Sequence, residues 1–328
     1  MEGYEIIKPL GSDGNCNAFL GKEIESGQLV TIKRCKSAEG ELDEIEKKNL
    51  FNESRVLEGL DHEAIPKLYK RSPEEIVLEY VPGNSLEKVL LTKGTFAEKD
   101  ALRIAYELAG IMRYLHGRRS PIIYRDLKPA NIVMKPDGHV SLIDYGAARF
   151  YERGERADTL NLGTLGFAAP EQFGYLGQTD PRTDIFCFGM TLLQLVSGVD
   201  TRDMDAVVNY KKNGVKGISQ DLLGIVEKCT RADREDRFRS FKEIQEELGA
   251  LPKRKKLRKI KGALKVMALA SCLSLIISAG IIKGEELTDY ATADMSARLP
   301  AVRIRLGYAR LWIENYLFNE NDEVIDIE

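Results

Sequence analysis

Three short segments in the middle of the chain constrain its fold more than any other sequence feature. They are Tyr124-Arg125-Asp126-Leu127-Lys128-Pro129-Ala130-Asn131, Asp144-Tyr145-Gly146 and Ala169-Pro170-Glu171. The first lies between a predicted helix and a predicted strand, and the second directly follows a strand and precedes a tight turn. Each segment alone is a weak signal, but their order and spacing together are not expected by chance.

Length and composition describe a folded globular protein. The chain has 328 residues, enough for one large or two ordinary domains, with 43% hydrophobic and 30% charged residues. A net charge of −3 gives no basic field for nucleic acid, so no nucleic-acid partner is expected. The five cysteines are scattered without a C-x-x-C pair, which argues against a zinc site or a disulfide framework and fits a reducing compartment.

The pattern of apolar residues predicts an α+β fold with a small β lobe followed by a larger helical lobe. Strands are expected over 4–10, 18–24, 29–35, 67–69 and 75–80, with a helix over 42–60. After Pro82-Gly83 the chain becomes helical, and Thr95-Phe96-Ala97-Glu98 predicts a capping box that opens a helix ending near His116. Further strands are expected over 132–135 and 140–143, and helices over 185–196, 219–229 and 241–248.

The middle segments contain groups suited to phosphoryl transfer, which needs a phosphate clamp, a metal site and a group that orients the attacking hydroxyl. Asp126 could accept the proton of a hydroxyl, and Lys128 could offset the charge of the transferred phosphoryl. Asn131 and Asp144 offer oxygen atoms of the kind that Mg²⁺ prefers beside phosphates.

Over about residues 4–250 the chain resembles the eukaryotic-like, or Hanks-type, serine/threonine protein kinase family, and most closely its bacterial membrane-anchored members. The resemblance implies a bilobal kinase domain over 1–250, with an N-lobe over about 1–80 and a C-lobe over about 84–250. It also implies ATP and Mg²⁺ as cofactors, with Mn²⁺ as an alternative, and protein substrates that carry serine or threonine. Lys128 after Asp126-Leu127 is the serine/threonine form of this loop.

The resemblance assigns roles to individual residues. Val30-Thr31-Ile32-Lys33 looks like the lysine motif of the third strand, Glu53 like its helix partner, and Glu79-Tyr80-Val81 like the adenine-binding hinge after gatekeeper Leu78. The implied catalytic residues are Asp126, Lys128, Lys33 and Glu53, and the implied metal ligands are Asn131 and Asp144. The implied nucleotide contacts are Gly11, Gly14, Ala18, Lys33, Glu79, Val81, Asn131 and Asp144. The implied structural residues are Glu171 with its ion-pair partner Arg237, and Asp184 in the central helix.

The loop expected to cover the phosphates departs from the family pattern G-x-G-x-x-G. Gly11 matches the first glycine, but Asp13 falls at the second and Cys16 at the third, while Gly14 comes one place late. Side chains there keep the backbone from the phosphates, and a carboxylate repels them. We therefore expect weaker nucleotide binding than is usual, or a different position of the loop.

Two aromatic substitutions also distinguish the chain from the family pattern. Tyr124 replaces the usual histidine before Arg125, a residue that packs and hydrogen-bonds without taking part in chemistry. Tyr145 replaces the phenylalanine after Asp144, which should cost little provided its hydroxyl finds a partner.

Arg125 predicts regulation through the loop between Asp144 and Glu171, because in the family this arginine pairs with a phosphate on that loop. Thr159 is the better candidate for autophosphorylation, with a solvated threonine of no special role as the alternative. Thr164 is expected to position structure and substrate.

The C-terminal part predicts a membrane anchor. Eight lysines and arginines between 253 and 265 precede 17 uncharged residues from Val266 to Ile282. We expect a basic juxtamembrane segment over 251–262, a transmembrane helix over 263–282 and an acidic outer tail over 283–328, with the kinase domain in the cytoplasm. The alternative for the apolar segment is a buried core helix. No signal peptide is visible near Met1.

Three functions fit these patterns to different degrees. The first is an active protein kinase regulated by autophosphorylation. The second is a membrane-tethered pseudokinase that signals by conformation, favoured by Asp13 and Cys16 but not by the retained Lys33, Asp126 and Asp144. The third is a small-molecule phosphotransferase, against which the Ala169-Pro170-Glu171 segment argues. Homodimerisation is suggested by the resemblance alone. The segment 299–318 could be an interfacial helix, a partner-binding segment or a small folded piece.

Overall fold

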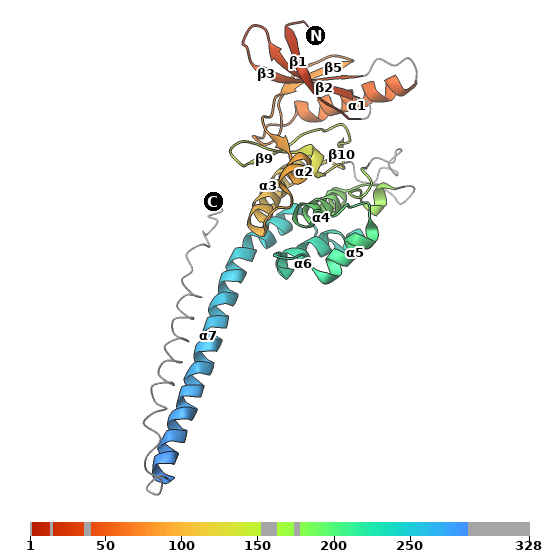
Figure 1. Cartoon of the computed structure of the whole chain (residues 1–328). Helices are drawn as coiled ribbons and strands as arrows, with labels where there is room; N and C mark the ends of the chain where they lie inside the picture. The colour runs from red at the N-terminus through yellow and green to blue at the C-terminus, as the bar shows by residue number, and fades with distance from the viewer. Residues whose placement is uncertain (1, 14–15, 36–40, 152–162, 174–177, 288–328) are drawn as a thin grey trace. The chain divides into compact units, whose positions relative to one another are not determined.

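The structure is a computed structural model, and it describes residues 2–13, 16–35, 41–151, 163–173 and 178–287. The side chains of residues 12, 13, 16, 41–46 and 276–287 lie outside this description. Contacts divide the chain into two compact units, Met1–Leu248 and Gly249–Glu328. The first unit contains the segments with the predicted catalytic, metal and nucleotide residues, and many of its elements are labelled in Figure 1.

The N-terminal lobe is an antiparallel sheet of order β1-β2-β3-β5-β4 with one helix. Figure 1 labels four of these strands and the helix α1. Its core is formed by Val30, Ile32 and Val77, which alternate with residues that face the other side of the sheet. The register places Ala18 opposite Lys33. The elements are β1 (Tyr4–Asp13), β2 (Cys16–Glu23), β3 (Leu29–Cys35), α1 (Glu41–Glu58), β4 (Leu68–Arg71) and β5 (Glu75–Glu79).

The C-terminal lobe is mainly helical and carries the loops of the site on short strands. Its central helix α4 is buried along most of its length, as its apolar sequence predicts. The elements are β6 (Asn84–Ser85), α2 (Leu86–Lys93), α3 (Glu98–His116), β7 (Ile122–Ile123), η1 (Pro129–Asn131), β8 (Ile132–Met134), β9 (Val140–Leu142), β10 (Arg149–Phe150), η2 (Pro170–Gln172), α4 (Pro181–Ser197), α5 (Met204–Asn213), α6 (Gln220–Cys229), η3 (Arg234–Asp236) and α7 (Phe241–Leu287). The predicted α+β bilobal fold is confirmed.

Several details differ from the sequence-based predictions. The prediction of a capping box at the start of α3 is wrong, because Ala97 occupies the N-cap position and no side chain caps the helix there. Helices α2 and α5 were not predicted: α2 has only eight residues, and α5 buries only Val207, so neither gives a clear apolar period. The last helix does not end at Leu248 but continues through Pro252 to Leu287, since good helix formers flank the proline.

The second unit contains the continuation of α7. The basic side chains from Lys253 to Lys261 are exposed on this helix. Among the described residues, no helix offers a stretch that is long and apolar enough to cross a membrane. The predicted transmembrane segment 263–282 includes residues whose side chains lie outside the description, and the predicted tail lies outside it from residue 288 onward.

Candidate active site

Lys33 joins two acidic side chains from distant parts of the chain. Its Nζ lies 2.6 Å from Glu53 Oε1 on α1 and 2.8 Å from Asp144 Oδ1, which follows β9. Glu53 Oε1 also accepts a hydrogen bond from the backbone N–H of Tyr145 at 3.1 Å. The N-terminal lobe is thereby tied to the loop that carries Asp144.

The opposite charges of Lys33 and Asp144 shift each other's pKa values toward the ionised forms. Burial alone would lower the pKa of Lys33, but the neighbouring carboxylates of Asp144 and Glu53 outweigh it and raise this pKa. The Lys33 ammonium lowers the pKa of Asp144, while burial raises the pKa of Glu53 against the attraction of Lys33. An ionised Asp144 beside a charged Lys33 is what a site for phosphate and metal needs.

Asp126 is held at the centre of a second cluster. Its Oδ1 accepts a hydrogen bond from Thr164 Oγ1 at 2.7 Å, and its Oδ2 accepts one from Asn131 Nδ2 at 2.9 Å. Lys128 Nζ lies 2.9 Å from Asp126 Oδ2 and donates to Thr164 Oγ1 at 2.8 Å. These contacts leave the Asp126 carboxylate in one defined orientation with a cation beside it.

Asp184 on α4 holds the backbone of the loop 124–131, called the catalytic loop below. Its carboxylate is buried and accepts hydrogen bonds from the N–H groups of Tyr124 at 2.9 Å and Arg125 at 2.6 Å. His116 at the end of α3 contacts the same carboxylate through Nε2 at 2.8 Å. The structural role that the resemblance implies for Asp184 therefore has a geometric basis, and His116 is a partner that the sequence did not reveal.

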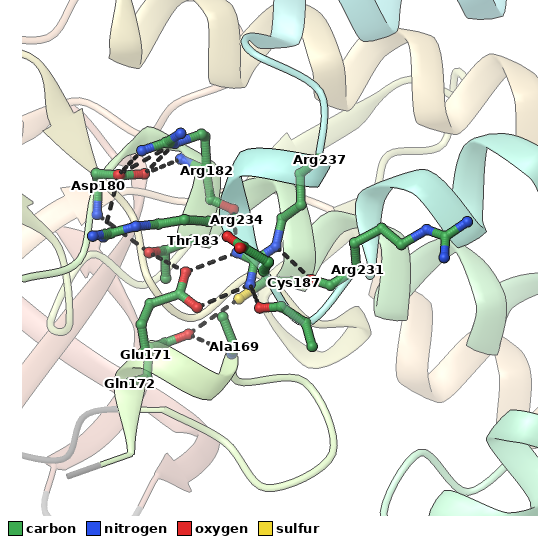
Figure 2. A network of polar contacts seen from close by, with 12 residues as sticks. Ala169, Glu171, Gln172, Asp180, Arg182, Thr183, Cys187, Arg231, Arg234 and Arg237 are labelled. Carbon is green, nitrogen blue, oxygen red and sulfur yellow. Dashed lines mark hydrogen bonds and ion pairs between the residues drawn. The ribbon is translucent and has the colours of Figure 1, made fainter. Parts of the chain in front are cut away.

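Glu171 and Arg237 form a buried, bidentate ion pair, seen at the centre of Figure 2. The two hydrogen bonds are 2.8 and 2.9 Å long, and Thr183 donates a third to Glu171 at 2.9 Å. Burial opposes ionisation of Glu171, but the hydrogen bonds and charge of Arg237 outweigh it and hold the pKa of this carboxyl below its ordinary value. Arg237 also donates to three backbone carbonyls, those of Arg231, Arg182 and Ala232. The pair joins η2, at the end of the loop that begins at Asp144, to the residue that follows η3.

Four of the predicted nucleotide contacts, Gly11, Ala18, Lys33 and Glu79, lie on strands of the N-terminal sheet. A β-carbon at Gly11 would meet nothing within 4 Å, so the protein's own packing does not require glycine there. Ala18 lies opposite Lys33, and Leu78 before the hinge is buried. The backbone N–H of Glu79 donates to the backbone carbonyl of Lys67. The backbone of Val81 takes part in no hydrogen bond among the described residues. Gly14 lies outside the described residues.

The two aromatic substitutions have different consequences. Tyr124 is buried and donates its hydroxyl hydrogen bond to the carbonyl of Ile143, so it packs and hydrogen-bonds as predicted. Tyr145 packs edge-on against Tyr124, with ring centroids 5.2 Å apart. Its hydroxyl is buried without a hydrogen-bond partner in the described part of the chain, so the proviso attached to this substitution is not met. Burial raises the pKa of both phenols well above the ordinary value.

Of the predicted regulatory residues, the structure describes Arg125 and Thr164. Arg125 is buried and donates from Nε to the Ala147 carbonyl at 2.6 Å. Thr164 contacts Asp126 and Lys128, as described above. Thr159 lies outside the described residues.

The donor atoms present fit ATP and Mg²⁺. The side-chain nitrogen of Asn131 donates to Asp126, so its side-chain oxygen remains for a metal. The backbone carbonyl of Asn131 accepts a hydrogen bond from the N–H of Ile143, the residue before Asp144, at 2.9 Å. The described residues contain no cluster of three His, Cys, Asp or Glu side chains that could hold a metal alone. Mg²⁺ typically takes one or two protein ligands and completes its shell with phosphates and water, which suits Asn131 and Asp144.

Comparison with known proteins identifies the family. The family model described as "Protein kinase domain" matches residues 4–248. Similar curated proteins include "Serine/threonine-protein kinase D" of Synechocystis sp., 34% identical over 59% of this chain and 40% of its own. They also include the "Probable serine/threonine-protein kinase KIN1 homolog" of Encephalitozoon cuniculi, 29% identical over 68% and 42%, and "Wall-associated receptor kinase 5" of Arabidopsis thaliana, 29% identical over 76% and 38%.

The chain spans about two fifths of the length of these relatives. The match of the family model covers three quarters of the chain, from the first strand of the N-terminal lobe into α7, and includes every cluster described above. The chain therefore belongs to the protein kinase domain family.

Proposed function

We propose that the protein transfers the γ-phosphoryl group of ATP to serine or threonine hydroxyls of proteins. The observation that carries the proposal is the double cluster of the site, in which Lys33 is held by Glu53 and Asp144 while Asp126 is held by Asn131 and Thr164. A binding module has no physical need for both clusters. Lys128 beside Asp126 supports serine and threonine rather than tyrosine as acceptors.

Each side chain has one task in this proposal. Lys33 binds the α- and β-phosphates and is kept in place by Glu53. Asp144 and Asn131 would hold Mg²⁺, which would supply positive charge beside the phosphates. Asp126 orients the substrate hydroxyl and accepts its proton, and Lys128 offsets the charge that develops on the transferred group.

The test is autophosphorylation of the purified full chain with radiolabelled ATP and Mg²⁺, with sites mapped by mass spectrometry. We expect label in the wild type and a loss of at least about 100-fold in Asp126→Asn, which keeps the size but not the charge of the side chain. Equal label in Asp126→Asn would show that a contaminating kinase is responsible. Label at Thr159 would also support regulation through Arg125.

A pseudokinase is the second candidate, favoured by Asp13 and Cys16 at the positions of the second and third loop glycines. Such a protein binds nucleotide without using it. Thermal stabilisation by ATP and Mg²⁺, with no transfer either to itself or to generic protein substrates, would favour this function over an active kinase.

We further propose that residues 263–282 anchor the chain in a membrane with the kinase domain on the cytoplasmic side. The support is the uncharged run from Val266 to Ile282 behind a block of lysines and arginines. Homodimerisation stays a prediction from the family resemblance.

A further inference from the structure

We propose that Gln172 positions the catalytic loop, because its side-chain amide holds the peptide that leads into Asp126. Gln172 ends η2, directly after Glu171, and only 5% of it is exposed. The test of this proposal by kcat rests on the kinase function proposed above, whereas its test by hydrogen exchange does not.

Both ends of the Gln172 amide are engaged, and they reach different elements. The oxygen accepts hydrogen bonds from the backbone N–H of Ala169 at 2.9 Å and from the thiol of Cys187 on α4 at 3.4 Å, as Figure 2 shows. The nitrogen donates to the backbone carbonyl of Arg125 at 2.9 Å. One side chain thus joins η2, the central helix and the catalytic loop.

The carbonyl that Gln172 holds belongs to a residue with a strained backbone. Arg125 has φ of 69°, a left-handed conformation that an L-residue adopts only when its surroundings impose it. Two buried side chains do so: Asp184 accepts from the Arg125 N–H at 2.6 Å, and Gln172 donates to its carbonyl. The backbone of Arg125 is therefore fixed on both sides.

Fixing this carbonyl also fixes the start of Asp126. The Arg125 carbonyl and the Asp126 N–H lie in one rigid peptide plane, so rotation of the plane would carry the Asp126 backbone with it. A small displacement of a group that orients a substrate can lower the rate strongly without weakening nucleotide binding.

The same amide also borders the segment that carries Thr164. A β-carbon at Gly163 would lie 2.9 Å from Gln172 Nε2 and 2.5 Å from the Ala168 β-carbon, so the chain passes closely over the amide there. Thr164, the next residue, donates to Asp126. Gln172 is thus in contact with both segments that place the Asp126 carboxylate.

The simpler alternative is that Gln172 only caps η2, by accepting a hydrogen bond from the N–H of Ala169. Two variants of the full chain separate these roles. Gln172→Glu keeps an oxygen for Ala169 but, ionised, has no donor for the Arg125 carbonyl, whereas Gln172→Met keeps the volume and loses both bonds. Cys187→Ala is the matched control, since it removes the thiol that donates to the amide oxygen and leaves the amide nitrogen able to donate to the Arg125 carbonyl.

We expect kcat to fall about tenfold or more in both Gln172 variants at about pH 8.5, with KM for ATP within about threefold of wild type. Cys187→Ala should retain kcat within about twofold. A loss in Gln172→Met alone, unchanged kcat in both, or an equal loss in Cys187→Ala would overturn the proposal. So would loss of ATP binding together with a collapse of the unfolding temperature in both Gln172 variants, because that would mark a general folding role.

Hydrogen exchange measured by mass spectrometry provides the readout that does not need activity. The amides of Tyr124 and Arg125 should exchange about tenfold faster in both Gln172 variants, while those of β3 and β5 stay unchanged. If the wild type transfers no phosphate, the kinase proposal fails and this measurement decides the role of Gln172. Unchanged exchange in the catalytic loop would overturn it.

Discussion

The hydroxyl of Tyr145 is a departure from good hydrogen bonding in the site. It is buried without a hydrogen-bond partner among the described residues, although the ring itself packs well against Tyr124. A buried polar group without a partner costs about 1–3 kcal/mol. The sequence shows that Tyr145 adds a hydroxyl at this position. It could not predict whether that hydroxyl would find a hydrogen-bond partner.

We therefore predict that Tyr145→Phe raises the free energy of unfolding by about 1 kcal/mol or more. The measurement is urea unfolding of the two proteins side by side. Tyr124→Phe is the matched control, because it removes the same atom from a neighbouring ring whose hydroxyl is bonded to the Ile143 carbonyl. It should lower stability, and an equal effect of both substitutions would contradict the explanation.

At the scale of elements, the ion pair of Glu171 and Arg237 joins η2 to the loop before α7. Because Arg237 holds the pKa of Glu171 below its ordinary value in the folded state, the pair stabilises the fold above the unfolded-state pKa of about 4.3. This contribution is lost as the pH falls through the folded-state pKa.

Glu171→Gln should lower the free energy of unfolding by about 3 kcal/mol at neutral pH, since it leaves the buried Arg237 charge without its counter-ion. The difference from wild type should shrink as the pH falls below about 4.3, where Glu171 of the unfolded chain takes up a proton while the folded state still keeps it ionised. Urea unfolding at a series of pH values measures this. Glu227→Gln, which breaks the exposed pair with Arg231, should cost less than about 0.5 kcal/mol at any pH. A constant difference for Glu171→Gln across the pH series would exclude the ion pair as its cause.

Local patterns predicted most of the longer elements and pointed to residues of the candidate site, but they did not predict the contacts that join distant segments. Lys33, Asp126 and Asp144 could be found because each lies in a short, ordered motif. Gln172 and His116 could not, since their partners are 47 and 68 residues away and neither side chain has an unusual sequence context. Short elements such as α2 were missed because eight residues hardly show a period.

At the scale of the whole molecule, the kinase domain ends within a helix whose sequence changes character. Basic residues from Lys253 to Lys261 are followed on α7 by apolar side chains that are exposed, among them Leu269 and Leu273. Exposed apolar side chains behind a basic block favour a membrane environment over water.

If residues 263–282 anchor the chain, the 328-residue chain should stay in the membrane fraction after alkaline carbonate extraction. Replacing both Leu269 and Leu273 by lysine should release it, because each charge near the middle of a membrane helix costs about 2.5–3.5 kcal/mol on insertion scales. Leu257→Lys is the control: this leucine is also exposed on α7 but lies in the basic segment, so the variant should remain membrane-bound. Release of the wild type by carbonate would exclude the anchor, and retention of the double variant would mean that another part of the chain holds it to the membrane.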